Sequence, residues 1–568
     1  MGLRGADMAR IAAKDLKALY EEAKRIRAPY ESNWRMAAAY CSPRQLSGWN
    51  IAGPLTSPES AMAKRMAYDN TGVRSLPKFA AVLNRIATPE NQIWSRVKTD
   101  DYLMKSHSVR AFFDELNRKM WKMRYDPKAG FSQAVNESYL SIGLYAMGPL
   151  SLTWQKPSPL RRKGGYKYRG QPVKDIFLLW SDEGDVTHVF RRQWYNARQA
   201  ASKFGKDKLP DDINIELSKP VPDESRFFEI VWALYEQTDY DPDRIDHRRH
   251  PVCGNYLYVG GGHSYVGDEE GFTSHPLLTP RIGTESGDSY GFSVAGMALP
   301  ALGGLSAQKK TVLRAGHRAV DPTLLAGDDG VMSGRIDIRP GHIIYNAVDS
   351  QGRPLIRTLE SGNPVIAEKL MQDEREDIQD SFLVTLFKMF DESPQMTATE
   401  VVERLADRAA MVAPIMSRLQ GELLGPLIER EIALLAEHGL FPEMPPELIE
   451  AEGEYEIMYT SAMARSANGE AVKGFLQWHD ILEKRAQAEQ NPDILDWADM
   501  DAAAPEIAEA MAVPTRWVSD PEKVQKRRAD RQQQTEQQQM LQQAPAIASV
   551  VNGALKRDGT SNAKGVPN

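Results

Sequence analysis

Apolar residues recur with helical spacing in three stretches between residues 293 and 438. In the first two, 293–320 and 365–390, they stand three or four positions apart, which is typical of an amphipathic helix. The third starts at a capping box at 397–400 and ends before Gly439. We therefore expect two helices followed by a long helix. The apolar positions expected on the first two helices are Leu299, Leu302, Leu305, Val312, Leu313, Leu370, Ile378, Phe382, Leu386 and Phe387.

The segments between these helices are expected to differ in character. Residues 321–364 are rich in Gly and Pro and contain two candidate paired strands, 332–338 and 342–348. Residues 391–398 form a short polar loop. Pro414 and Pro426 fall inside the long helix, where a proline removes a backbone donor and costs about 3 kcal/mol or more. We expect a kink at each proline, with division into three shorter helices as the alternative.

The first 290 residues change from helical to strand periodicity near residue 150. Helical patterns at 8–40, 73–86, 109–125 and 131–147 precede strand patterns at 150–154, 173–180, 186–194 and 227–235. This order predicts an α+β body. After residue 453 the chain predicts one short strand, then further helices, and finally a Gln-rich, polar tail without periodicity.

Composition narrows the functional classes. The chain is 42% hydrophobic and 26% charged, with a net charge of −7. A protein that grips duplex DNA tightly presents clustered Lys and Arg, so the charge argues against a repressor or a packaging nuclease. It leaves open a conduit in which DNA slides, because firm phosphate contacts would slow the DNA. The net charge is equally compatible with a protein that does not touch DNA.

Cysteine usage and hydropathy add three expectations. Two cysteines, Cys41 and Cys253, are too few for a disulfide framework or for a zinc site made of cysteines alone. No apolar run approaches about 18 residues, so we expect no membrane span. The first 27 residues lack the apolar core of a signal peptide, which favours synthesis and assembly in a cytoplasm.

Motifs for catalysis are almost absent. The chain has neither a phosphate-binding loop ending in Gly-Lys-Ser/Thr nor a His-Glu-x-x-His zinc motif, so it encodes no ATP-driven motor. Residues Gly287-Asp288-Ser289-Tyr290-Gly291 fit the nucleophile elbow of serine hydrolases. No convincing buried strand precedes this motif, and nothing in the sequence places a histidine and an acid beside it. The simpler interpretation is a tight loop in which Gly291 adopts an unusual backbone angle.

An acidic cluster lies on the second expected helix. Asp373, Glu374, Glu376 and Asp377 could be read as metal ligands, but Lys369 and Arg375 are interleaved with them. We therefore expect a solvated helix face. In a ring, such acidic stripes could instead pair with basic stripes across a subunit boundary. We expect no cofactor, no metal and no catalytic residue.

Several whole segments carry a family resemblance. Residues 288–293 (Asp-Ser-Tyr-Gly-Phe-Ser) lead into an Ala/Leu-rich helix, and 319–325 (Ala-Val-Asp-Pro-Thr-Leu-Leu) and 396–401 (Met-Thr-Ala-Thr-Glu-Val) follow. Asp-Asn-Thr-Gly at 69–72 precedes a helix, and 83–94 continue the pattern. Over most of residues 10–530 the chain resembles the portal proteins, or head-to-tail connectors, of short-tailed, T7-like phages.

The resemblance implies an α+β, mostly helical subunit of the portal type. Its parts would be an α/β wing at 1–290, a two-helix stem at 291–320 and 365–390, a small β-containing clip at 321–364, a tunnel loop at 391–398, a long kinked wing helix with its connection at 399–452, a helical crown at 453–535 and a disordered tail at 536–568.

The resemblance also implies a function and partners. The subunits would form a homododecameric ring at one capsid vertex of the virion, assembled in the cytoplasm of a host bacterium. The ring would be the channel for double-stranded DNA, contacted without sequence preference, during packaging and ejection. Its other partners would be the terminase large subunit, tail adaptor or nozzle proteins, and capsid and scaffolding proteins, with no membrane.

Single-residue roles follow from position within that plan. The tunnel loop would contact DNA through Asp391, Glu392, Ser393 and Gln395. The clip would dock partners through Arg335, Arg339, Arg353 and Arg357, although scattered solvent-facing arginines are the simpler interpretation. Two rival functions remain open, namely a serine hydrolase acting through Ser289 and another structural protein of the virion, from the tail or the capsid interior.

Overall fold

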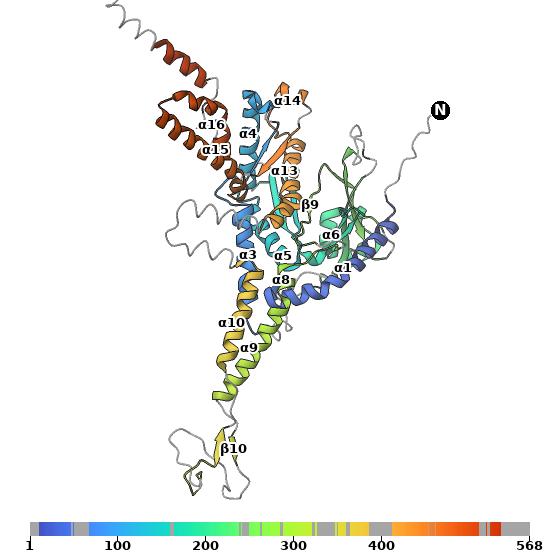
Figure 1. Ribbon diagram of the computed structural model, residues 1–568. Coiled ribbons are helices and arrows are strands. Elements are labelled where there is room, and N and C mark those ends of the chain that lie inside the picture. Colours follow the sequence, from blue (N-terminus) through green and yellow to red (C-terminus); the bar gives the residue numbers. More distant parts are fainter. Residues whose placement is uncertain are drawn as a thin grey trace, which may run out of the picture. The chain divides into compact units, whose positions relative to one another are not determined.

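A computed structural model provides the structure, and the chain divides into two compact units, Met1–Ser461 and Ala462–Asn568. The fold is mixed α+β, as expected (Figure 1). A search of the described residues finds no helix with the length and apolarity needed to cross a membrane. The structure describes residues 11–46, 49, 67–100, 102–159, 164–237, 240, 249–261, 264–284, 288–320, 324–326, 347–348, 350–358, 364–384, 412–451, 454–459, 462–510, 519 and 523–534.

Four helices of the first unit lie before residue 150 among the described residues. Each helix buries residues with the helical spacing that predicted it, so its apolar face is turned inward. The first helix continues through Pro29 without ending there. The four are α1 (Ala13–Cys41), α3 (Thr71–Ala87), α4 (His107–Arg124) and α5 (Phe131–Tyr145).

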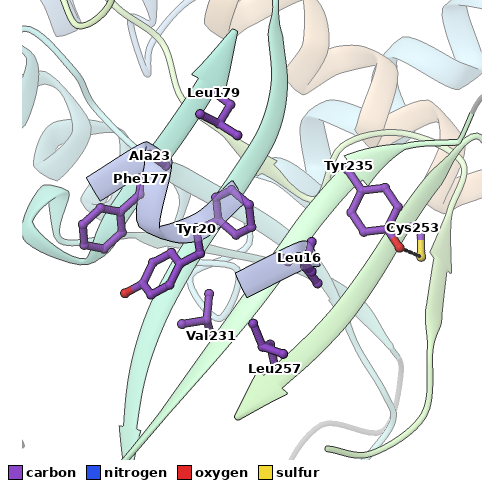
Figure 2. Close-up of a cluster of buried hydrophobic side chains, with 11 residues drawn as sticks. Leu16, Tyr20, Ala23, Phe177, Leu179, Val231, Tyr235, Cys253 and Leu257 are labelled. Carbon is purple, nitrogen blue, oxygen red and sulfur yellow. Dashed lines mark hydrogen bonds between the residues drawn. The ribbon is translucent and has the colours of Figure 1, made fainter. Parts of the chain in front are cut away.

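An antiparallel five-stranded sheet lies against α1. Leu16, Tyr20 and Ala23 of α1 pack on residues of the sheet such as Phe177 and Val231 (Figure 2). The strand order is β4-β5-β6-β7-β8, so each strand pairs with its sequence neighbour. The strands are β4 (Ile176–Trp180), β5 (Val186–Tyr195), β6 (Phe228–Glu236), β7 (Val252–Tyr258) and β8 (Glu270–Phe272).

Smaller sheets bring distant parts of the chain together. A three-stranded sheet has the order β3-β2-β9, and β1 pairs with β12, although about 360 residues separate them. The first unit therefore includes β12, which precedes the boundary at Ser461. The strands are β1 (Ser95–Lys98), β2 (Leu150–Gln155), β3 (Gly165–Gly170), β9 (Leu277–Leu278) and β12 (Glu456–Tyr459), and the short helices nearby are α6 (Ala197–Phe204), α7 (Asp211–Leu217) and α14 (Pro446–Glu450).

Two of the expected helices form a hairpin in which they lie side by side (Figure 1). The first is divided into α8 (Val294–Met297) and α9 (Leu299–Val320), and the second is α10 (Pro364–Ser381). Between them, β10 (Leu324–Ala326) pairs with β11 (Ile356–Thr358). The candidate strand 332–338 lies wholly outside the described residues, and the candidate strand 342–348 lies outside them except for Ala347 and Val348.

The buried face of this hairpin differs in part from the expected one. Leu302, Leu305, Ile378 and Phe382 are buried as predicted. Leu370 and Leu313, which the sequence also places on the apolar stripes, are 53% and 44% exposed in the single chain. Met371 takes the inward position, because it lies seven residues before Ile378 and so shares its face. Leu386 and Phe387 lie outside the described residues.

The long helix is described from residue 412 onward. Residues 412–419 are α-helical and include Pro414, and a π-helical turn at Gln420–Leu424 leads into α13 (Gly425–Glu437). The Gly425 N–H donates to the carbonyl of Gln420, five residues back, so the turn is widened just before Pro426, which has no N–H. Within the described residues the helix continues through Pro426 without dividing, and Pro414 lies in its first described turn. It ends before Gly439, whose φ is 62°.

The second unit is mostly helical over its described part. It contains α15 (Ala462–Glu489), the 3₁₀ segment η7 (Pro492–Trp497), α16 (Met500–Ala510) and a helix at 523–534. The further helices expected after residue 453 are thus confirmed over the described residues.

Candidate functional site

The base of the α9–α10 hairpin is joined to the body by the motif at residues 69–72. The Asp69 carboxylate accepts hydrogen bonds from the N–H of Thr71, at 2.8 Å, and from the Thr71 hydroxyl. Its other oxygen accepts from Nη2 of Arg375 on α10, at 3.2 Å. One aspartate therefore orders the first turn of α3 and ties α10 to it.

Gly72 lets α9 approach the same place. A Cβ built on Gly72 would lie 2.8 Å from Cδ2 of Leu302 on α9 and 3.1 Å from the carbonyl oxygen of Tyr40. Both distances are shorter than ordinary van der Waals contacts, so a side chain here would displace α9 or α1. The T-shaped Phe79–Phe382 pair, with ring centroids 6.5 Å apart, adds an apolar contact between α3 and the residue after α10.

The electrostatics of Asp69 give this junction a pH dependence. Partial burial opposes ionisation, but the hydrogen bonds from Thr71 and the Arg375 guanidinium outweigh it and lower the pKa of Asp69. A carboxylate with a lowered folded-state pKa stabilises the fold above its unfolded pKa of about 3.9. That stabilisation is lost as the pH falls through the folded-state pKa.

We expect Asp69→Asn to lower the thermal midpoint at pH 7. The deficit relative to wild type should shrink as the pH falls from about 4 through the lower folded-state pKa, because below that pKa the wild-type carboxyl is also neutral. Thermal unfolding across pH measures this, with Asp207→Asn in an exposed segment as the control. A deficit that stays constant down to the lowest pH would contradict the role of the Asp69 charge.

A second junction precedes α8, at residues 288–291. Tyr290 is fully buried, and its hydroxyl accepts from the N–H of Leu178 at 3.0 Å. Its ring packs edge-on against Trp34 and Trp180, with centroids 5.4 and 4.8 Å away. Gly291 has φ 75°, which confirms the expected unusual angle. The loop therefore anchors the start of the hairpin in the body.

An arginine pair links this loop to the π-helical turn. The backbone N–H and Nε of Arg281 donate to Oε2 of Glu422, at 2.8 and 3.3 Å, and Nη1 donates to the carbonyl of Ser289, at 3.0 Å. Nε of Arg418 donates to the other oxygen of Glu422, at 2.9 Å. Glu422 thus connects the long helix to the loop that begins the hairpin.

Comparison with known proteins assigns this arrangement to a family. The family model described as bacteriophage head to tail connecting protein matches residues 13–518, which include both junctions and the hairpin. The chain belongs to the phage head-to-tail connecting proteins. Over 533 residues it is 24% identical to the portal protein of Salmonella phage epsilon15, covering 92% of each chain. It is 26% identical to the probable portal protein of Bordetella phage BPP-1 over 492 residues, covering 85% of each.

Membership confirms the resemblance and the functional class that it implies. The chain is a structural connector subunit of the portal type. Such a connector acts as an oligomeric ring with contacts to capsid and tail, and its place is the capsid vertex of a virion. The family match does not test the roles expected of single residues.

The structure brings no catalytic group to Ser289 of this connector within its described residues. Ser289 lies in a bend, and the described residues before it, 279–284 and 288, form no strand of the kind that leads into a nucleophile elbow. His438 stacks on Trp154, with centroids 4.1 Å apart, and bonds to the carbonyl of Leu434. His317 is on an exposed part of α9, and His342 lies outside the described residues.

The other expected site residues are only partly described. Arg353 is exposed in a turn beside the Val348–Pro354 bridge, and Arg357 lies in β11. Asp373 and its acidic neighbours make no metal-binding group within the described part of the chain. The residues that lie outside the described ranges are Asp391, Glu392, Ser393 and Gln395 of the tunnel loop and Arg335 and Arg339 of the clip.

Sequence patterns did not reveal the two polar junctions. Asp69 and Arg375 are 306 positions apart, and Arg281 and Glu422 are 141 apart. One local signal existed in each case. Asp69 stands two residues before a threonine at a helix start, and Arg418 and Glu422 have the i,i+4 spacing of a helical ion pair.

Proposed function

We propose that the connector assembles as a homododecameric ring at the portal vertex. The family match carries this proposal, because it covers the hairpin and the body together. Three side chains on the hairpin support it. Leu313, Val320 and Leu370 are 44, 88 and 53% exposed in the single chain. A ring would bury such apolar side chains between neighbours, since one face of each subunit meets the opposite face of the next.

The parts of the subunit then take the roles that the family suggests. Residues 291–320 and 365–390 are the stem around the channel, and 321–364 form the clip. The wing is 1–290, the long helix with its connection is 399–452, and the crown is 453–535. The anchored base of the hairpin suits this plan, because a channel wall must hold its position while DNA moves past it.

The channel passes double-stranded DNA inward during packaging and outward during ejection. Contact is non-specific and weak, in keeping with the overall charge of −7. The loop at 391–398 reaches the duplex through Asp391, Glu392, Ser393 and Gln395. Acidic and polar side chains there favour sliding, because they form no firm phosphate contacts.

The clip docks the terminase large subunit first and a tail adaptor or nozzle protein later. Arg335, Arg339, Arg353 and Arg357 supply its positive charge, and exposed Arg353 is the described residue that supports this assignment. Capsid and scaffolding proteins contact the outer parts of the ring. Assembly takes place in the cytoplasm of the bacterial host.

A double charge reversal in the tunnel loop tests the conduit. We expect Asp391→Lys together with Glu392→Lys to reduce packaged DNA about tenfold, because each lysine adds a phosphate contact that slows sliding. The readout is the DNA content of heads made in cells that supply only the variant connector. Asp391→Asn with Glu392→Gln is the control and should package as wild type. Normal packaging by the lysine variant would contradict a loop that contacts DNA.

A further inference from the structure

The two helices of the hairpin carry opposite charges. Helix α9 (Leu299–Val320) contains four Lys and Arg and no Asp or Glu, which gives it a charge of +4. Helix α10 (Pro364–Ser381) contains six Asp and Glu and two Lys and Arg, which gives it a charge of −4. The charges of the two helices cancel in sum, but the positive charge lies on α9 and the negative charge lies on α10.

Each charge is arranged as a stripe. Lys310, Arg314 and Arg318 on α9 are spaced four residues apart, so they follow one side of the helix. Arg314 and Arg318 are exposed, and Lys310 is half-buried against the ring of Tyr68. We call these three residues the basic stripe.

The acidic stripe lies on α10 and consists of Asp373, Asp377 and Asp380. All three residues are exposed, and their spacing of four and three residues places them on one side of the helix. Met371 and Ile378 face the core two residues before Asp373 and Asp380. Two residues correspond to about 200° around a helix, so the stripe points away from the core.

The two stripes do not neutralise each other within the chain. Among the described residues, a single ion pair connects α10 to the rest of the chain, and it joins Arg375 to Asp69. Glu374, which lies beside Gly304 of α9, belongs to neither stripe. Arg314, Arg318, Asp373, Asp377 and Asp380 have no recorded ion-pair partner among the described residues.

A ring makes the consequence of this polarity large. If α9 met α9 and α10 met α10 around the ring, two helices of charge +4 and two of charge −4 would lie side by side at every boundary. Like charges repel, so this arrangement is unfavourable. If α9 of one subunit meets α10 of the next, opposite charges face each other at every boundary. The exposed Leu313 and Leu370 supply apolar contact on the same two helices.

We propose that the basic stripe of α9 binds the acidic stripe of α10 on a neighbouring copy of this chain. This inference rests on the proposed ring and specifies which surfaces close it. The pairing sets the order of neighbours and makes closure sensitive to salt, because exposed charges are screened over about 8 Å at physiological ionic strength.

Charge reversal tests the pairing in the full chain. The first variant, Arg314→Glu with Arg318→Glu, is acidic on both helices, and the second, Asp373→Lys with Asp377→Lys, is basic on both. We expect each alone to lose at least about tenfold of its ring fraction by mass photometry, because like charges then meet at every boundary. The chain that carries all four changes should recover rings, because its charges are again opposite.

An equal mixture of the two variants gives a sharper result. Alternating subunits restore opposite charges at every boundary, so mixed rings should form and should contain both variants in equal number. The matched control is Arg118→Glu with Lys122→Glu, an exposed pair with the same spacing on α4, which should assemble as wild type. Recovery by mixing also excludes a folding defect as the cause of the single losses.

The outcomes separate this inference from the proposed function. If the wild type forms no ring, both the proposed function and the pairing of the two stripes are wrong. If the wild type forms rings and both single variants form them equally well, the pairing is overturned while the ring stands. A control on α4 that loses rings as strongly as the stem variants would also overturn it, as would a mixture that fails to co-assemble.

Discussion

Replacing Glu431 with glutamine is expected to lower the free energy of unfolding of the first unit by about 3–5 kcal/mol. Glu431 is fully buried on α13, and its carboxylate accepts both Nε and Nη2 of Arg124 on α4, at 2.9 and 2.7 Å. The Tyr168 hydroxyl donates to the same carboxylate at 2.6 Å. Removing the negative charge leaves the guanidinium buried without compensation.

The environment of Arg124 explains why this cost is large. Its side chain is 2% exposed and lies over the ring of Trp94, 4.4 Å from the centroid. Burial alone would lower the pKa of Arg124, but the Glu431 carboxylate outweighs burial and raises it. A guanidinium is so strong a base that Arg124 keeps its charge even without Glu431, so it cannot relieve the loss by releasing a proton.

Chemical denaturation followed by circular dichroism measures the effect of Glu431→Gln. Glu429→Gln is the matched control, because Glu429 is exposed two residues earlier on the same helix and should change stability by less than about 0.5 kcal/mol. The double variant Arg124→Met, Glu431→Met should lose less than Glu431→Gln, since it leaves no buried charge. Equal losses in Glu429→Gln and Glu431→Gln would contradict the importance of the buried pair.

Replacing Arg27 with methionine is expected to cost about 3 kcal/mol, because it leaves backbone carbonyls without donors in a buried place. Nη1 of Arg27 donates to the carbonyls of Lys174 and Ile176, at 2.9 and 2.7 Å, and more weakly to that of Val173, at 3.3 Å. The guanidinium also lies 3.6 Å from the centroid of Phe177. Arg27 therefore fastens α1 to the beginning of β4.

Arg27→Lys distinguishes charge from geometry. A lysine keeps the charge but not the planar fork of donors, so it should recover only part of the loss. Arg25→Met is the control, because Arg25 is exposed on the same helix. The measurement is the same denaturation experiment. Full recovery by lysine would show that charge alone, and not the set of carbonyl contacts, is what α1 requires.

Local periodicity was sufficient to predict the longer helices and the strands β2, β4, β5, β6 and β12. The stretches around Leu302 and Ile378 have a clear helical period, and the strands of the five-stranded sheet alternate or are rich in β-branched and aromatic residues. These signals lie within a few residues of each other along the chain, so a single sequence contains them.

The faces of helices were harder to assign. Leu370 and Met371 are adjacent and both apolar, so the sequence cannot say which faces inward. The choice is made by packing, because Met371 is in line with Ile378 and Phe382, and Phe382 meets Phe79 of α3. Periodicity also cannot distinguish burial within one chain from burial by a neighbouring copy.

The buried charges were not foreseen at all. Arg124 and Glu431 are 307 positions apart, and charged residues on helices usually face solvent. One signal was present, since Glu431 shares a helix face with Leu427, Ile428 and Leu435. The pairing of β1 with β12 was equally invisible, because a four-residue strand carries no information about a distant partner.

The central claim is that this connector closes into a ring with a channel. The most direct measurement is the mass and shape of the purified full chain, by mass photometry with electron microscopy of negatively stained particles. We expect closed rings with the mass of a dodecamer and a central hole wide enough for a DNA duplex. A compact monomer that stays monomeric at high concentration and low salt would contradict the claim.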